Sequence, residues 1–217
     1  MTKNFLKLTL LVMSLALIFA PLQVQAQGNP GAPKPCISQA EVQLKGDLRR
    51  VLTDHLIWTR NYMISAIEGL KDQKQVEARL LKNQEDIGNA IKPYYGEAAG
   101  NKLTELFKEH IVIAAKIIDA AKSGNQAEFN KLHKEWHRNA DDIAQFLSSA
   151  NPNWSTNVLK DLLYTHLKLL TDQIVARLKK DYDAEILAFD KGEDHILKLA
   201  DTLTEGIVKQ FPDRFKK

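Results

Sequence analysis

An apolar segment that ends in a histidine occurs three times in this chain, and this repeat constrains the fold more than any other feature. The three histidines are 55 and 56 positions apart. A fixed period of this kind indicates repeated supersecondary units that pack against their neighbours. We therefore expect three similar units. The segments read Leu48-x-x-Val51-Leu52-x-x-His55, Leu103-x-x-Leu106-Phe107-x-x-His110 and Leu159-x-x-Leu162-Leu163-x-x-His166.

Prolines place the ends of these units. Beyond the N-terminal region the chain has three prolines, Pro93, Pro152 and Pro212, which are 59 and 60 positions apart. Each follows an apolar run with helical periodicity, and proline stops a helix because it lacks a backbone N–H and clashes with the preceding turn. No segment shows the period-two alternation of a strand. The sequence therefore predicts helices separated by short turns and no sheet.

Capping patterns place the helix starts. Ser38, Asp72 and Asn125 each stand three positions before a Glu or Gln, which is the spacing of a capping box. The sequence predicts an all-α fold, an elongated bundle of about six helices built from three antiparallel helical hairpins. The expected helices span about residues 39–69, 73–91, 98–122, 126–149, 155–180 and 183–210, in repeats 38–96, 97–154 and 155–217 of one domain.

The N-terminal region has the pattern of an export signal. Residues 1–26 combine a basic start, an apolar stretch of 13 residues and a small-residue cleavage site, which predicts a signal peptide and a secreted or extracytoplasmic protein. Retention of this segment as an anchor is the alternative. Residues 27–37 are rich in Pro and Gly, so we expect them to form a flexible tether.

Charge and cysteine content limit the partners. Without residues 1–26, which carry two lysines and no acidic residue, the formal charge falls from +3 to +1. The remaining charges alternate in sign along helical faces, which argues against nucleic acid as a partner. Cys36 is the single cysteine, so it is either a free thiol or the link of a dimer. Association with the cell envelope or a membrane surface suits an exported chain.

The repeated histidines predict one polar layer inside the bundle. At 100° per residue, His55, His110 and His166 each fall at the centre of an apolar helical face. Counting from each hairpin turn places Asn83 and Asp86 beside His55, Trp136, His137 and Asn139 beside His110, and His195 or Leu199 beside His166. The candidate metal site consists of His55, His110, His166, Asn83, Asp86 and Asn139, and its ion would be a transition metal such as zinc, copper or iron.

The same residues have a simpler interpretation. A neutral buried histidine needs a hydrogen-bond partner, and an Asn or Asp across its hairpin supplies one without any ligand. Outside the layer, His133 and His137 are one turn apart with Asp141 a further turn on, a spacing that is sterically possible for a surface metal site. Because His137 and Asp141 lie over 100° from the apolar stripe of their helix, a solvated face is the favoured interpretation.

The segment after the first histidine combines aromatic and charged side chains, whereas the equivalent segments of the other two repeats, residues 113–117 and 169–173, have no aromatic residue. Trp58, Arg60 and Tyr62 are candidates to line a pocket for a cofactor or small ligand, the alternative being core aromatics with a snorkelling arginine. If the protein were an enzyme, Arg60, His55 and Asp86 would be its candidate active-site residues. The sequence contains no phosphate-binding glycine loop, GxSxG or HExxH motif, so an enzyme is the less favoured class.

Three stretches carry a resemblance to a known family. Residues 54–62, 83–96 and 139–143 resemble a family of small exported all-helical proteins of Gram-positive spore-forming bacteria, some labelled glycosyltransferase. That label implies a nucleotide-binding sheet fold, which the helical pattern here does not support. We expect a non-catalytic binding or envelope-associated protein. A purely structural or interaction module and an enzyme are the alternatives.

Overall fold

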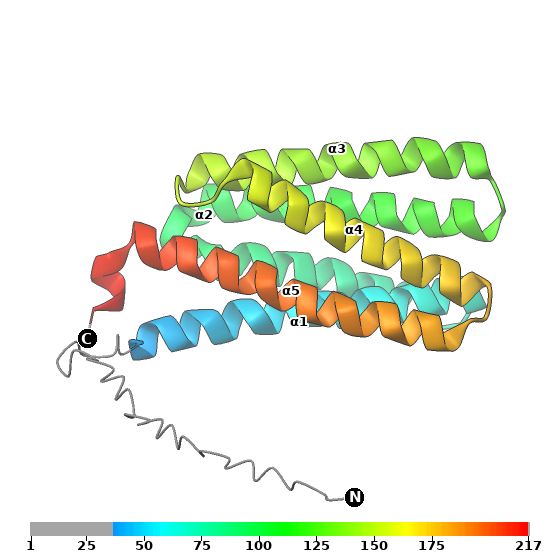
Figure 1. Ribbon diagram of the computed structural model, residues 1–217, viewed down its shortest axis with the longest axis horizontal. Coiled ribbons are helices and arrows are strands. Elements are labelled where there is room, and N and C mark those ends of the chain that lie inside the picture. Colours follow the sequence, from blue (N-terminus) through cyan, green and yellow to red (C-terminus); the bar gives the residue numbers. More distant parts are fainter. Residues whose placement is uncertain (1–36, 217) are drawn as a thin grey trace, which may run out of the picture. The chain divides into compact units, whose positions relative to one another are not determined.

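The computed structural model describes residues 37–216, and these residues form only helices (Figure 1). The predicted all-α class is confirmed, and no strand occurs in this range. The signal peptide, nearly all of the tether and Cys36 lie outside the described residues. The elements are α1 (Gln39–Glu68), α2 (Gln73–Lys122), α3 (Gln126–Ala150), α4 (Thr156–Leu178), α5 (Tyr182–Gln210) and a 3₁₀ helix (Pro212–Phe215).

Two of the three predicted caps form as expected. The Ser38 hydroxyl accepts from the Glu41 N–H at 3.2 Å, and the Asn125 side chain accepts from the Glu128 N–H at 3.1 Å. Both bonds satisfy N–H groups that the first helical turn leaves without a partner. The predicted cap at Asp72 is wrong, because its side chain accepts from the Ser65 hydroxyl at 2.9 Å and makes no capping bond.

The long helix α2 accounts for the difference between five helices and the expected six. Separate helices over 73–91 and 98–122 were predicted, whereas the structure has one element interrupted at Gly96, whose φ is 83° and ψ 171°. Pro93 lies within the helix before that break. The bend brings the two parts of α2 together, and a Cβ on Gly88 would lie 2.5 Å from the Gly100 carbonyl oxygen. Glycine is therefore required where the two parts meet.

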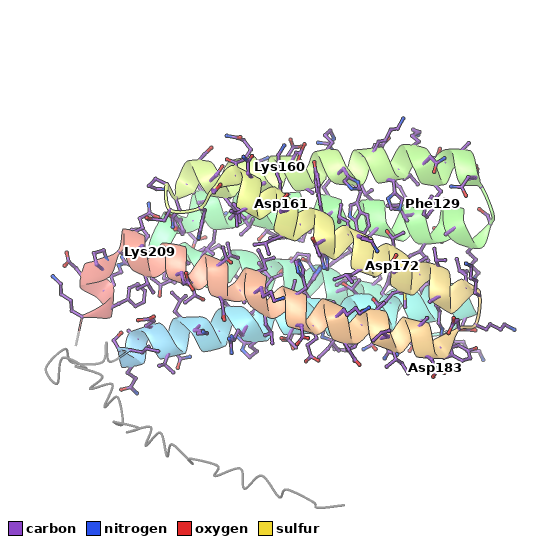
Figure 2. The ribbon with its side chains drawn as sticks, viewed as in Figure 1. Phe129, Lys160, Asp161, Asp172, Asp183 and Lys209 are labelled. Atoms are coloured by element: carbon purple, nitrogen blue, oxygen red, sulfur yellow. The ribbon has the colours of Figure 1, made fainter. Side chains whose placement is uncertain are left out.

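The helices close around one core. Helix α1 packs against α2 and α5, α2 also packs against α3, α3 against α4, and α4 against α5. Side chains fill the space between them, as Figure 2 shows. The largest fully buried side chains are Trp136, Met63 and branched aliphatic residues. Among residues 37–216, no helix combines the length and apolar character needed to cross a bilayer.

Candidate functional site: a buried histidine layer

Three histidines from three helices meet in the core. His55 of α1, His110 of α2 and His166 of α4 are 4%, 2% and 5% exposed. The ring centres of His55 and His166 are 5.5 Å apart, and those of His110 and His166 are 6.3 Å apart. These residues, which we call the histidine layer, therefore form one contiguous group, as the helical periodicity of the repeats predicts.

Burial keeps the histidine layer uncharged. The pKa of His55 falls from 6.5 to about 3, first because burial disfavours the charged ring and then because His110 is close. Burial likewise lowers the pKa of His110 to about 4. For His166 the pKa is lowered by burial and further by His55, His110 and His195. At neutral pH the layer thus presents neutral imidazoles, the form in which histidine binds metals.

The predicted pairing of His110 with Asn139 is present and fixes the histidine tautomer. The Nδ1 of His110 lies 2.8 Å from Oδ1 of Asn139. The Asn139 amide nitrogen donates to the Leu106 carbonyl at 3.1 Å and to Oε2 of Glu109 at 3.2 Å, so its oxygen must face the histidine. His110 therefore carries its proton on Nδ1 and leaves a lone pair on Nε2.

His55 is paired with Gln84 and not with the predicted Asn83. The Gln84 amide nitrogen donates to the Leu80 carbonyl at 2.7 Å and to Oδ1 of Asn83 at 3.2 Å, and it lies 3.3 Å from Nδ1 of His55. His55 therefore accepts at Nδ1 and carries its proton on Nε2. Asn83 donates instead to the Val51 carbonyl at 2.9 Å. Sequence reasoning missed Gln84, although it follows His55 by 29 positions just as Asn139 follows His110.

A histidine also lies at the corresponding place relative to His166. His195 of α5 donates from Nε2 to the Leu162 carbonyl at 2.7 Å. This is the carbonyl four residues before His166, just as Asn83 and Asn139 donate to the carbonyls four residues before His55 and His110. Of the two expected neighbours of His166, His195 is the titratable one, and it lowers the pKa of His166 further.

Asp86 does not join the histidine layer. Its side chain is 33% exposed and lies 3.6 Å from Arg79 and 3.7 Å from Lys82. Asp86 is two positions beyond Gln84, which turns it about 200° around the helix and away from the core. There it lines a surface groove of about 630 Å³ between α1 and the first part of α2.

The candidate pocket residues of α1 point to different neighbours. Arg60 donates to both carboxylate oxygens of Glu185 at 2.7 and 2.9 Å, and Glu185 is only 1% exposed. Trp58 stacks beneath Arg79 of α2 at 5.2 Å. Tyr62 is buried, and burial raises its pKa. Trp58 and Arg60 thus contact α2 and α5 respectively, and no sequence pattern pointed to Glu185 as the partner of Arg60.

Unpaired polar atoms gather near the histidine layer. Within residues 37–216, four buried side-chain atoms lack a hydrogen-bond partner, and three belong to Thr59, Gln84 and Trp136. Gln84 contacts His55, Thr59 is one turn beyond it, and the Trp136 ring lies 5.1 Å from that of His110. No group of three or more His, Cys, Asp or Glu side chains in the described range is already arranged to hold a metal ion.

Comparisons with known proteins found no match for this chain. No family model, no curated protein and no solved structure matches it. The resemblance to a family of exported helical proteins therefore stays a prediction, and the histidine layer is the feature from which a function can be inferred.

Proposed function

We propose that this protein is an exported helical-bundle protein that binds rather than catalyses, and that its histidine layer holds a transition-metal ion such as zinc, copper or iron. One observation carries the proposal: three neutral imidazoles from three helices lie together. The ring centre of His166 is 5.5 Å from that of His55 and 6.3 Å from that of His110. With metal–nitrogen distances of about 2.0–2.1 Å, two imidazoles on one ion have ring centres about 4.5 Å apart at right angles and about 6.4 Å apart in line.

Binding would require small adjustments of side chains. His110 already has a lone pair on Nε2, because Asn139 holds its proton on Nδ1. His55 must move its proton from Nε2 to Nδ1 before Nε2 can bind a metal. The Oε1 atom of Gln84, which has no hydrogen-bond partner, is an acceptor available for the Nδ1 proton after rotation of the amide. Such outer-shell acceptors orient metal-binding histidines in other proteins.

The proposal includes the repeat architecture. Three antiparallel hairpins, with the two parts of α2 in different hairpins, would each supply one histidine to the shared interior. The spacing of 29 positions from His55 to Gln84 and from His110 to Asn139 supports this arrangement. So does the matching set of side-chain bonds to the carbonyls of Val51, Leu106 and Leu162.

Metal analysis tests the proposed function. We expect tag-free protein to retain a transition metal, or to bind Zn²⁺, Cu²⁺, Fe²⁺ or Ni²⁺ after chelation with an increase in Tm. A ligand at one hundred times its Kd stabilises by about 2.7 kcal/mol. In a His137→Ala background, which removes the separate histidine pair of α3, the increase should vanish in His166→Gln and persist in His195→Gln, a matched change at a histidine outside the layer. No bound metal and no increase in Tm with any ion would contradict the proposal.

A second candidate function is a structural or interaction module of the cell envelope. It is favoured by the hydrogen bonds that Gln84 and Asn139 already make to His55 and His110, which satisfy one nitrogen of each ring without a ligand. This candidate predicts full stability in chelator and a partner at the envelope surface, with Cys36 as the link if the protein is a dimer. A strictly monomeric protein that fails to bind cell-wall or membrane preparations would count against it.

A further inference from the structure

Helix α3 carries a second group of histidines, separate from the histidine layer. His133 and His137 are one turn apart, and their ring centres are 6.2 Å apart with the planes tilted by 35°. Both side chains are half-buried, and they lie against α4. Residues four positions apart on a helix share one face, so two imidazoles at this spacing can reach a common ion.

Hydrogen bonds determine which nitrogen is protonated in each of the two rings. The Nδ1 of His137 lies 2.8 Å from the carbonyl oxygen of His133, which can only accept. His137 therefore carries its proton on Nδ1 and has a lone pair on Nε2. The Thr171 hydroxyl donates to the Leu167 carbonyl at 2.8 Å, so the proton between Thr171 and Nε2 of His133, at 3.4 Å, belongs to the histidine. In this tautomer Nδ1 of His133 is unprotonated.

Neighbouring side chains hold the pair in place. The Phe129 ring lies 4.4 Å from that of His133, and the Tyr164 ring lies 4.8 Å from that of His137. The Tyr164 hydroxyl donates to Asp141 at 2.7 Å, and Lys160 lies 3.0 Å from the same carboxylate. Asp141 is thus already engaged, and water would complete the coordination of an ion held by the two rings.

Trp136 separates this pair from the histidine layer. Its buried ring contacts His133 on one side at 5.9 Å and His110 on the other at 5.1 Å. A side chain of this size between the two groups prevents them from sharing one ion. Any metal held by the pair is therefore a second ion, closer to solvent than the layer.

We propose that His133 and His137 bind a divalent transition-metal ion in an open site at the α3–α4 interface. The ring separation of 6.2 Å is near the in-line value of about 6.4 Å, so the two rings would turn toward each other to take adjacent positions on one ion. Copper(II) is the best probe, because affinity for nitrogen ligands peaks at copper among the first-row divalent ions. With two protein ligands the ion exchanges with solvent, which suits capture rather than permanent storage.

The experiment is a Cu²⁺ titration of the full mature chain, monitored by electron paramagnetic resonance. A Cys36→Ser background removes the sole thiol. The key variant combines His137→Lys with Lys134→His, which keeps the composition but puts the two histidines on adjacent positions that diverge by about 100°. His137→Ala is the simpler companion variant, and circular dichroism checks that each protein retains its helices.

We expect wild type and His166→Gln to bind a copper ion whose electron paramagnetic resonance spectrum shows couplings to nitrogen. Both His137 variants should bind one copper ion fewer. Loss in the His137 variants alone supports this site whatever happens at the histidine layer. Copper binding that is unchanged in the His137→Lys, Lys134→His protein overturns the proposal. So does a loss confined to His166→Gln, which would leave the histidine layer as the only site.

Discussion

Two adjacent layers of the core, one apolar and one containing the three histidines, are stabilised in different ways. The apolar layer is next to the histidine layer along the same helices, and its side chains surround a cavity of only about 20 Å³. Apart from Trp154, whose indole N–H donates to the Thr202 carbonyl at 3.2 Å, its side chains need only van der Waals contact. They are Leu48, Leu52, Ile87, Ile91, Leu103, Phe107, Ile143, Leu147, Trp154, Leu159, Leu163, Leu199 and Leu203.

The histidine layer, by contrast, needs a partner for every nitrogen. Gln84 and Asn139 supply one each to His55 and His110, yet three buried polar atoms nearby stay unpaired. Burying an unpaired polar group costs about 1–3 kcal/mol. Apolar side chains at the histidines and at their polar neighbours would together avoid that cost. The apolar layer is held by contact alone and the histidine layer by hydrogen bonds as well, so the two should respond differently to substitution and to acid, as the following predictions test.

The largest expected effect is in the apolar layer. Leu159 is fully buried, and Leu159→Ala should lower the free energy of unfolding by about 2–5 kcal/mol, because it removes apolar contacts and leaves a cavity. The loss should be the same at pH 7.5 and pH 5, since no titrating group is involved. Urea unfolding at both pH values measures this loss. A loss that depends strongly on pH would contradict the expected difference between the two layers.

Acid should act on the histidine layer with a comparable total effect. The unfolded chain takes up protons near pH 6.5, whereas folded His55 and His110 do so only near pH 3 and 4. Stability is therefore fully present above pH 6.5 and falls as the pH drops toward 4, by about 2 kcal/mol for each of these histidines at pH 5.

The control for the acid effect is His110→Leu in metal-free protein. Leucine does not titrate, so this variant should lose less stability between pH 7.5 and pH 5 than wild type does. Urea unfolding in chelator gives both slopes. Equal slopes in the two proteins would mean that His110 titrates normally in the folded state.

A smaller effect is expected from the amide partner of His110. Asn139→Leu leaves Nδ1–H of His110 without its acceptor and should cost about 1–3 kcal/mol. Adding His110→Leu should recover part of that loss, because the unpaired donor is then absent as well. A double-mutant cycle by urea unfolding gives the coupling. Strictly additive losses would show that the pair is not coupled.

The smallest effect serves as a baseline on the solvent face. Lys168 and Asp172 form an ion pair one turn apart on α4, with side chains 72% and 47% exposed. Lys168→Ala should change the free energy of unfolding by less than about 0.5 kcal/mol, since exposed pairs are screened by water and salt. Thermal denaturation is sufficient to measure it. A loss as large as that of Asn139→Leu would show that surface charges rival the interior layer.

The sequence predicted the helical class and much of the layer, because both follow from periodicity. A histidine at the centre of an apolar face must be buried wherever that face packs, so His55, His110 and His166 were found without coordinates. Helix ends marked by Ser38 and Asn125 followed from local chemistry in the same way.

What failed was register and long-range pairing. Asn83 and Gln84 are neighbours, and a shift of one residue along α2 decides which of them faces His55. Arg60 meets Glu185 from a helix that is 125 positions away, which no local pattern reveals. The helix was expected to end before Pro93, but it continues through Pro93 and is interrupted only at Gly96.

The most direct test is nitrogen-15 NMR of the histidine rings in metal-free protein, assigned with single histidine variants. Titration from pH 7.5 to pH 5 should leave His55, His110 and His166 neutral, with the proton of His110 on Nδ1 and that of His55 on Nε2. Rings in the layer that titrate near pH 6.5 while the protein is still folded would contradict a shared, buried layer of neutral histidines.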